Sequence, residues 1–200
     1  NRAEIDSIRS IINTSSGETG WLLSEYLYRH GHDITCIVGH TTANPSFELT
    51  NIEYCQSPTK MLESCFSLAS SEDPPQAWIH VAAVLDYYPN PEVGKKSSGA
   101  DEWNIKLVSG PKHIPKLSAL VNGTIRIGFK LESNVSDKIL IENASNLLNN
   151  YNLNAVIGNI KENIHDENLP RGIIVLPGGN KKILNNNLDM CSNIESIISK

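Results

Sequence analysis

The sequence predicts an α/β fold, in which a mostly parallel β-sheet is covered by helices on both faces. Two observations support this prediction. Short apolar runs bounded by turn residues are typical of buried strands, and they alternate with segments whose apolar residues recur at helical spacing. A chain of 200 residues is also long enough to bury a full core in one domain.

The predicted strands are short and rich in β-branched residues. Their ranges are 33–38, 52–55, 77–84, 124–129, 155–158 and 172–177, with a strand-like segment at 103–108. The run 77–84 is the most apolar of them, so we expect it at the centre of the sheet. A turn over residues 178–180 follows the last strand.

The first predicted helix follows the Ser-Ser-Gly-x-x-Gly sequence of residues 15–20 and ends near Gly31. Ser136 is a candidate N-cap for a later helix, and Asp137 falls in the first turn of that helix. The remaining helices are predicted at 60–68, 114–121, 136–150 and 190–198.

One long segment interrupts this alternation. Residues 87–110 contain Pro89, Pro91, Gly94 and Gly99, and they show neither helical nor strand periodicity over most of their length. Connections of this length without their own secondary structure are usually functional or disordered. We therefore expect a flap over about 87–110, within a single domain that spans 1–200.

Composition narrows the function classes. The formal net charge is −5 and the basic residues form no runs, so we expect no nucleic-acid partner. The four cysteines lack metal-site spacing, and no apolar run approaches the ~20 residues of a membrane span. We expect a cytoplasmic protein that acts on small molecules, with no membrane association and no metal held by protein ligands.

The N-terminal segment 1–6 is polar and begins without Met. No strand precedes the first predicted helix, although an α/β sheet of this kind normally begins with one. We therefore expect a truncated N-terminus that lacks the first strand of the sheet.

The loop at residues 15–20 is a candidate anion site. The first-turn N–H groups of a helix lack intrahelical partners, and the helix macrodipole is positive there. Ser and Gly are also common in ordinary N-caps, so this pattern alone leaves both interpretations open.

Several motifs occur in a definite order along the chain. They are Glu4-Ile5-Asp6 with Ile12-Asn13, Ala82-Ala83-Val84-Leu85-Asp86-Tyr87, Lys95-Lys96, Gly110-Pro111-Lys112-His113, Gly128-Phe129 and Gly158-Asn159-Ile160. In order and spacing the chain resembles the phosphopantothenoylcysteine synthetase family in its free-standing bacterial form. The resemblance covers nearly the whole chain.

The resemblance implies a Rossmann-like sheet with the flap over the active site, and a homodimer. It also implies a two-step ligase reaction of coenzyme A biosynthesis. CTP or ATP, accompanied by Mg²⁺, activates the carboxylate of 4′-phosphopantothenate as an acyl-nucleotidate and releases pyrophosphate. The amine of cysteine then attacks to form the amide.

The resemblance assigns roles residue by residue. Asn13 and Lys95 occupy catalytic positions, Asn13 at the acyl-nucleotidate and Lys95 on the flap that closes over the triphosphate. Substrate-binding positions are Arg9, Ser16, Gly17 and Ala83, and nucleotide-binding positions are His80, Val81, Ala82, Asp86, Pro111, Lys112, His113, Ile114 and Phe129. Without the resemblance, a turn Asn, a surface Lys or a core Phe would explain most of these residues equally well.

Two departures from the family pattern favour an alternative. The family carries two lysines on the helix after Gly-Phe, whereas residues 146–151 hold no cation, and Ile160 replaces an Asp. Unless Lys130 or Lys138 substitutes, triphosphate binding is weakened. The alternative is a catalytically degenerate paralogue that binds nucleotide or pantothenate as a regulatory or structural subunit. A dinucleotide-dependent oxidoreductase is disfavoured, because no Gly-x-Gly-x-x-Gly follows a strand.

Overall fold

A computed structural model describes residues 1–200, and the chain divides into two compact units. The first unit comprises Asn1–Glu72 and Ala82–Leu120, and the second comprises Asp73–Val81 and Val121–Lys200. The chain therefore passes between the units at more than one point, and each unit is described by itself.

The second unit is built on a five-stranded sheet with the strand order β11-β10-β9-β8-β5. The strands are β5 (Ala77–His80), β8 (Ile125–Glu132), β9 (Ala155–Ile160), β10 (Gly172–Val175) and β11 (Lys181–Leu184). Strands β5, β8 and β9 are parallel, whereas β10 is antiparallel to both of its neighbours. Parallel strands need crossover connections, and α4 (Asp137–Tyr151) provides the crossover from β8 to β9.

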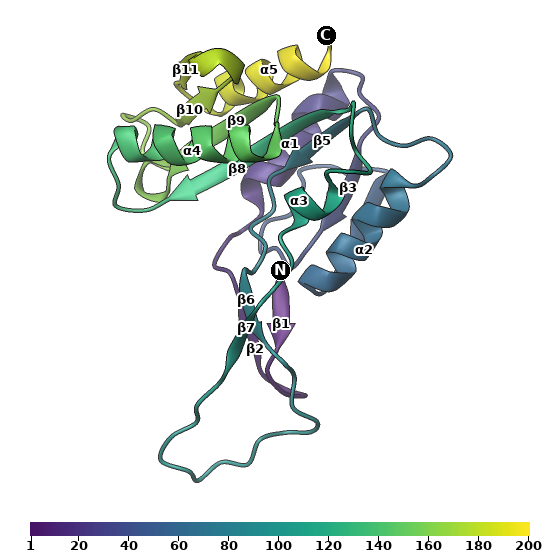
Figure 1. Ribbon diagram of the computed structural model, residues 1–200, viewed down its shortest axis with the longest axis vertical. Coiled ribbons are helices and arrows are strands. Elements are labelled where there is room, and N and C mark those ends of the chain that lie inside the picture. The colour runs from purple at the N-terminus through teal and green to yellow at the C-terminus, as the bar shows by residue number, and fades with distance from the viewer. The chain divides into compact units, whose positions relative to one another are not determined.

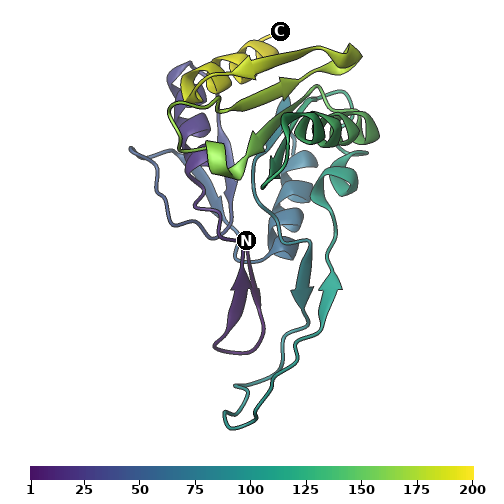
Figure 2. The same cartoon turned by 90° about the vertical axis from the view of Figure 1, so that its left-hand side faces the viewer.

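Helices cover both faces of this sheet. Helix α4 and helix α5 (Asn187–Ile198) lie on opposite sides of it (Figure 2). Every residue of β9 is buried, as expected for a strand covered on both faces. Gly158 faces α4 closely, because a Cβ at this position would lie 3.1 Å from Cγ of Leu140. The predicted α/β architecture is confirmed, with the antiparallel pair β10–β11 added at one edge.

The first unit contains three two-stranded sheets and three helices (Figure 1). Its elements are β1 (Arg2–Glu4), β2 (Ser10–Ile12), α1 (Glu18–Arg29), β3 (Thr35–Val38), β4 (Asn51–Tyr54), α2 (Pro58–Ala69), β6 (Tyr87–Pro89), β7 (Leu107–Ser109) and α3 (His113–Leu117). Strands β3 and β4 are parallel, while β1–β2 and β6–β7 are antiparallel pairs.

An apolar cluster anchors α1 in the first unit. Trp21 of α1 is buried with Cys36 and Leu49, and Phe47 packs against them. The indole N–H of Trp21 donates to the backbone oxygen of Ala43 at 2.9 Å, so the polar end of the side chain is also satisfied. This contact fixes the loop between β3 and β4 against α1.

Two strand predictions were too long or misplaced. The strand predicted at 77–84 ends at His80, because the amide of Val81 donates to the oxygen of Ile79 at 3.2 Å and so leaves the ladder. The strand-like segment 103–108 is replaced by a strand over Leu107–Ser109 that pairs with β6. Between β6 and β7, residues 90–106 contain neither helix nor strand.

Other predictions differ from the structure in the bounds or the presence of single elements. The N-terminal segment is not strandless, since β1 and β2 form a hairpin there. Helix α3 ends at Leu117 rather than at residue 121, and the turn at 178–180 leads into β11, which was not predicted.

The N-cap prediction is confirmed, because Ser136 accepts a hydrogen bond from the amide of Ile139. None of the helices combines the length and the apolar composition needed to cross a bilayer.

Candidate active site

The loop between β2 and α1 carries the first candidate catalytic residue. Asn13 is half-buried, and its side-chain amide donates to the backbone oxygen of Ala83 at 2.9 Å. These two residues are 70 positions apart in the sequence, and both belong to the predicted site. The bond fixes the orientation of the carboxamide, so that its oxygen points away from Ala83.

Gly17 shapes the start of α1. It has a φ of 85°, which favours glycine, and a Cβ at this position would collide with the side chain of Thr41. The backbone oxygen of Ser16 accepts from the amides of Thr42 and Ala43, both at 3.0 Å. The loop after β3 therefore lies against the helix start, and this contact by itself explains the Ser-Gly sequence.

Asp86 and Lys112 form the second pair of predicted site residues that the structure brings together. The ammonium nitrogen of Lys112 lies 3.1 Å from a carboxylate oxygen of Asp86. The amide of Gly110 also donates to the backbone oxygen of Asp86 at 2.8 Å, which aligns the two segments. Both charged side chains are more than half exposed, so the ion pair contributes little to stability and both groups remain accessible to a ligand.

His113 lies at the start of α3 and is buried. Burial lowers the pKa of its imidazole, and a hydrogen bond with the backbone of Pro58 opposes that shift. Its Nε2 atom is buried without a hydrogen-bond partner. A neutral imidazole satisfies this arrangement, because a protonated Nε2 would be an unpaired buried donor. Pro111 and Ile114, on either side, are half-buried.

The guanidinium of Arg9, a predicted substrate-binding group, already has a carboxylate partner. Its guanidinium forms an ion pair with the buried carboxylate of Asp6 at 2.5 Å and lies 5.0 Å from the ring centre of Trp103. The positive charge of Arg9 is therefore already balanced in this structure. Lys95, by contrast, is exposed on the flap.

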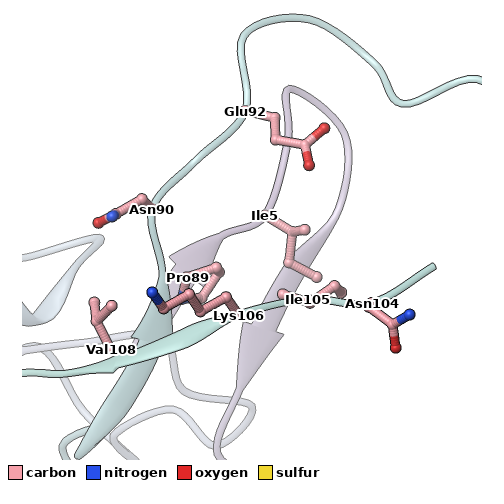
Figure 3. Close-up of a pocket in the computed structure, with 8 residues that line it drawn as sticks. All are labelled: Ile5, Pro89, Asn90, Glu92, Asn104, Ile105, Lys106 and Val108. Carbon is pink, nitrogen blue, oxygen red and sulfur yellow. The ribbon is translucent and has the colours of Figure 1, made fainter.

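A pocket of about 250 Å³ lies where the flap meets the N-terminal hairpin (Figure 3). Its apolar lining includes Ile5, Pro89 and Ile105, while Asn90 and Glu92 contribute polar groups. Every residue that lines it belongs to the first unit. None of these lining residues belongs to the predicted site.

The remaining predicted residues lie on the sheet of the second unit or directly after it. His80 ends β5 and is paired in register with Gly128, and Phe129 follows on β8, where it is opposite Ile157 of β9. His80, Val81 and Phe129 are all half-buried. Ala82 continues the chain into the first unit. The roles predicted for these residues stay predictions.

Lys130 and Lys138, the two lysines that could replace the family's triphosphate-binding lysines, differ in their surroundings. The ammonium of Lys130 lies 3.1 Å from Glu132, whereas Lys138 is exposed in the first turn of α4. The last turn of α4 carries no basic residue. Lys138 is therefore the better placed of the two to offer an uncompensated charge.

The sequence analysis assigned no role to Asp6, although Asp6 belongs to one of the motifs, and none to Trp103. Asp6 forms a local turn with the amides of Ile8 and Arg9, a pattern that the short Asp-Ser-Ile sequence could have suggested. Its bond to the amide of Lys96 spans 90 positions, and no local signal predicts such a contact.

Comparison with known proteins shows a consistent set of relatives. The family described as the DNA/pantothenate metabolism flavoprotein C-terminal domain matches residues 1–177. The coenzyme A biosynthesis bifunctional protein CoaBC of Methanocaldococcus jannaschii is 34% identical over 155 residues, which is 78% of this chain and 37% of that protein. CoaBC of Vibrio vulnificus is 30% identical over 137 residues, covering 66% of this chain and 33% of its own length. The chain thus spans about a third of the curated relatives it matches.

Solved structures share the fold. A DNA/pantothenate metabolism flavoprotein from Streptococcus pneumoniae superposes with a TM-score of 0.88 at 21% identity, covering 100% of this chain and 94% of that one. The C-terminal domain of a CoaBC protein superposes with a TM-score of 0.77 at 22% identity, covering 99% of this chain and 89% of that one. These likenesses establish the fold of the chain.

Proposed function

The chain belongs to the family of DNA/pantothenate metabolism flavoprotein C-terminal domains, and from this premise we propose that it is a phosphopantothenate–cysteine ligase of coenzyme A biosynthesis. In the proposed reaction the carboxylate of 4′-phosphopantothenate attacks the α-phosphate of a nucleoside triphosphate, and pyrophosphate leaves. The amine of cysteine then attacks the acyl carbon, loses a proton and displaces the nucleoside monophosphate.

The observation that carries this proposal is the bond between the Asn13 carboxamide and the oxygen of Ala83. A neutral amide that is held in one orientation can interact with an acyl-nucleotidate without acting as a competing nucleophile. Because the second carboxamide N–H is not needed for the bond to Ala83, it remains a donor for an acyl or phosphate oxygen. Preorganised donors of this kind stabilise charge that develops in the transition state.

We assign the nucleotide to the region of Asp86 and Lys112, where the polyphosphate would meet cations. Lys112 supplies one positive charge beside Asp86, and Lys95 on the flap supplies another. The ammonium of Lys112 would exchange its carboxylate partner for a phosphate, at little cost because the existing pair is exposed. CTP is the proposed co-substrate, with ATP as the alternative.

Mg²⁺ would enter with the triphosphate. No group of three or more His, Cys, Asp or Glu side chains is arranged to hold a metal ion. This fits the usual behaviour of Mg²⁺, which binds through substrate phosphates and one or two carboxylates rather than in an all-protein cage. When bound, the ion would neutralise phosphate charge; Asp86 is the proposed carboxylate neighbour.

A second candidate function is a catalytically degenerate subunit that binds nucleotide or pantothenate without turnover. The absence of basic residues from the last turn of α4 favours it. The two candidates differ in one measurable respect, because a degenerate subunit would bind CTP or 4′-phosphopantothenate in calorimetry and release no pyrophosphate. As a separate proposal, the ligase acts as a homodimer, which sedimentation analysis would test.

The experiment that tests the role of Asn13 is the Asn13→Asp variant in a stepwise assay. We expect pyrophosphate release and accumulation of the acyl-nucleotidate, detected by mass spectrometry, with amide formation reduced by roughly 10²-fold or more, as for removal of one oxyanion donor. Asn122→Asp, the same change at an exposed position between α3 and β8, serves as the control and should behave as the wild type. Normal amide formation by Asn13→Asp would show that the assigned role is wrong.

A further inference from the structure

The turn of the N-terminal hairpin holds the flap through its backbone. The amide of Ser7 donates to the oxygen of Gly94 at 3.1 Å, and the amide of Glu92 donates to the oxygen of Ile5 at 2.8 Å. The turn between β1 and β2 therefore runs beside the flap, and Figure 3 shows Ile5 and Glu92 on these neighbouring segments.

The carboxylate of Asp6 adds a polar link at the same place. Asp6 is only 2% exposed. Its Oδ1 atom accepts from the amides of Ile8 and Arg9 at 2.8 and 2.7 Å, which closes the hairpin turn. Its Oδ2 atom accepts from the Arg9 guanidinium and, at 3.0 Å, from the amide of Lys96 on the flap. Oδ1 therefore bonds only within the hairpin turn, whereas Oδ2 also bonds to the flap.

Arg9 completes this arrangement. While paired with Asp6, its guanidinium also lies 3.4 Å from the backbone oxygen of Lys96 and 5.0 Å from the ring centre of Trp103. The flap is therefore contacted at residues 92, 94, 96 and 103 by the hairpin turn, Ile5 to Arg9.

The protonation state of Asp6 agrees with its geometry. Burial alone would raise the pKa of this carboxyl group, but hydrogen bonds from Ile8, Lys96 and Arg9 outweigh burial and hold the pKa well below its ordinary value. Asp6 is therefore a carboxylate at every pH at which the protein would act, and both oxygens are acceptors.

We propose that Asp6 is a positioning residue for Lys95. Oδ2 of Asp6 binds the amide that follows Lys95, and the Ser7 amide binds the carbonyl that precedes it, so the backbone is held on both sides of this lysine. The aliphatic stem and ammonium of Lys95 then extend from a fixed origin toward the triphosphate. This inference rests on the proposed function, which assigns Lys95 to the triphosphate. It also proposes that Arg9 helps Asp6 to hold the flap instead of binding an anion directly.

The Asp6→Asn variant separates the two oxygens. An Asn side chain retains one acceptor for the amides of Ile8 and Arg9, while its NH₂ group cannot accept from Lys96 or Arg9. We expect the hairpin turn to persist and the exchange rate of the Lys96 amide, measured by NMR, to rise about tenfold or more, with tryptic cleavage after Lys95 and Lys96 accelerated in parallel. Asp101→Asn, which removes an exposed carboxylate from the same flap, should leave exchange and cleavage at wild-type rates.

A double-mutant cycle tests whether Asp6 acts through Lys95. In phosphopantothenate-dependent pyrophosphate release, Asp6→Asn should lower kcat or raise the KM for CTP about tenfold, and should add almost nothing in a Lys95→Ala background. A merely structural role for Asp6 would give multiplicative losses instead.

The outcomes separate the two proposals. Unchanged Lys96 exchange in Asp6→Asn, or multiplicative losses in the cycle, would overturn the positioning role even in an active ligase. If the folded wild type released no pyrophosphate, the proposed function and the task of Lys95 would both be wrong, while the exchange measurement would still decide whether Asp6 holds the flap.

Discussion

Two regions of the molecule are stabilised internally by different forces. One is the sheet of the second unit, and the other is the hairpin–flap region of the first unit, residues 2–12 and 87–110. In the sheet, Ile127 and Ile157 have no exposed surface, and Leu140 of α4 is 2% exposed. In the hairpin–flap region, hydrogen bonds link the hairpin turn, Ile5 to Arg9, to residues 92, 94 and 96 of the flap, and the Asp6–Arg9 ion pair lies within the turn itself. Apolar burial stabilises the sheet of the second unit, and directional polar contacts organise the hairpin–flap region of the first unit.

This difference has a functional meaning. Hydrophobic burial is strong but non-directional, so it gives a stable scaffold without specifying the position of one exposed atom. Hydrogen bonds to a buried carboxylate act at defined angles and lengths, so they can fix a backbone segment that is otherwise exposed. In the proposed ligase, hydrogen bonds of this kind would position Lys95 to reach the triphosphate.

The largest expected effect is a loss of stability when apolar packing in the sheet of the second unit is removed. Ile157→Ala on β9 should destabilise the protein by about 2–5 kcal/mol, because it removes buried methyl groups and leaves a cavity. Ile183→Ala is the matched control, since Ile183 on β11 is 55% exposed. Urea denaturation measures both. Equal losses for the two variants would contradict the assignment of β9 to the core.

The next effect concerns the start of α1. Gly17→Ala should cost about 1–3 kcal/mol and weaken catalysis, because alanine is strained at a φ of 85° and its methyl group would displace Thr41. Gly31→Ala isolates the backbone strain, because Gly31 has nearly the same φ, 86°, and a Cβ added there would meet no atom within 4 Å. Identical losses of stability and of activity in the two variants would show that the Thr41 contact is unimportant.

A smaller effect depends on pH. Because the folded-state pKa of His113 is lowered, the unfolded chain binds a proton more readily than the folded chain as the pH falls below about 6.5. Stability should be full above that pH and should decrease below it, by at most ~1.4 kcal/mol per pH unit from this residue. His113→Gln should remove this part of the pH dependence in denaturation curves. A slope that survives the substitution would have to come from other groups.

The smallest effect on stability is expected at Lys112. Lys112→Ala should change the free energy of unfolding by less than about 1 kcal/mol, because its ion pair with Asp86 is exposed. In the proposed ligase the same variant should raise the KM for CTP severalfold. Lys60→Ala, which removes another exposed paired lysine, should leave that KM unchanged. A raised KM in both variants would indicate a general charge effect.

The sequence predicted the parts of the fold that follow from apolar periodicity. Strands β8 and β9 and the helix α4 were predicted within a few residues of their observed bounds, because each repeats an apolar pattern over several residues, whereas the strand predicted at 77–84 ends at His80. The edge strand β11 was missed, since Lys181-Lys182-Ile183-Leu184 shows no alternation of a half-buried strand.

The candidate site was less predictable. The resemblance proposed Asn13 and Ala83 as members of one site, and the structure brings them together, although their functional roles stay predictions. The link between Asp6 and Lys96 was not foreseen, because it depends on how a hairpin turn and a distant flap meet in space rather than on either local sequence. The ion pair of Arg9 with Asp6 was not foreseen either, and the substrate-binding role of Arg9 stays a prediction.

The measurement that tests the central claim most directly is pyrophosphate release by the purified protein with Mg²⁺, CTP or ATP, and 4′-phosphopantothenate, in the absence of cysteine. The ligase proposal predicts release that requires 4′-phosphopantothenate and decreases strongly in Lys95→Ala. Release that ignores 4′-phosphopantothenate, or no release by a folded protein that binds the nucleotide, would contradict the proposal and favour the non-catalytic subunit.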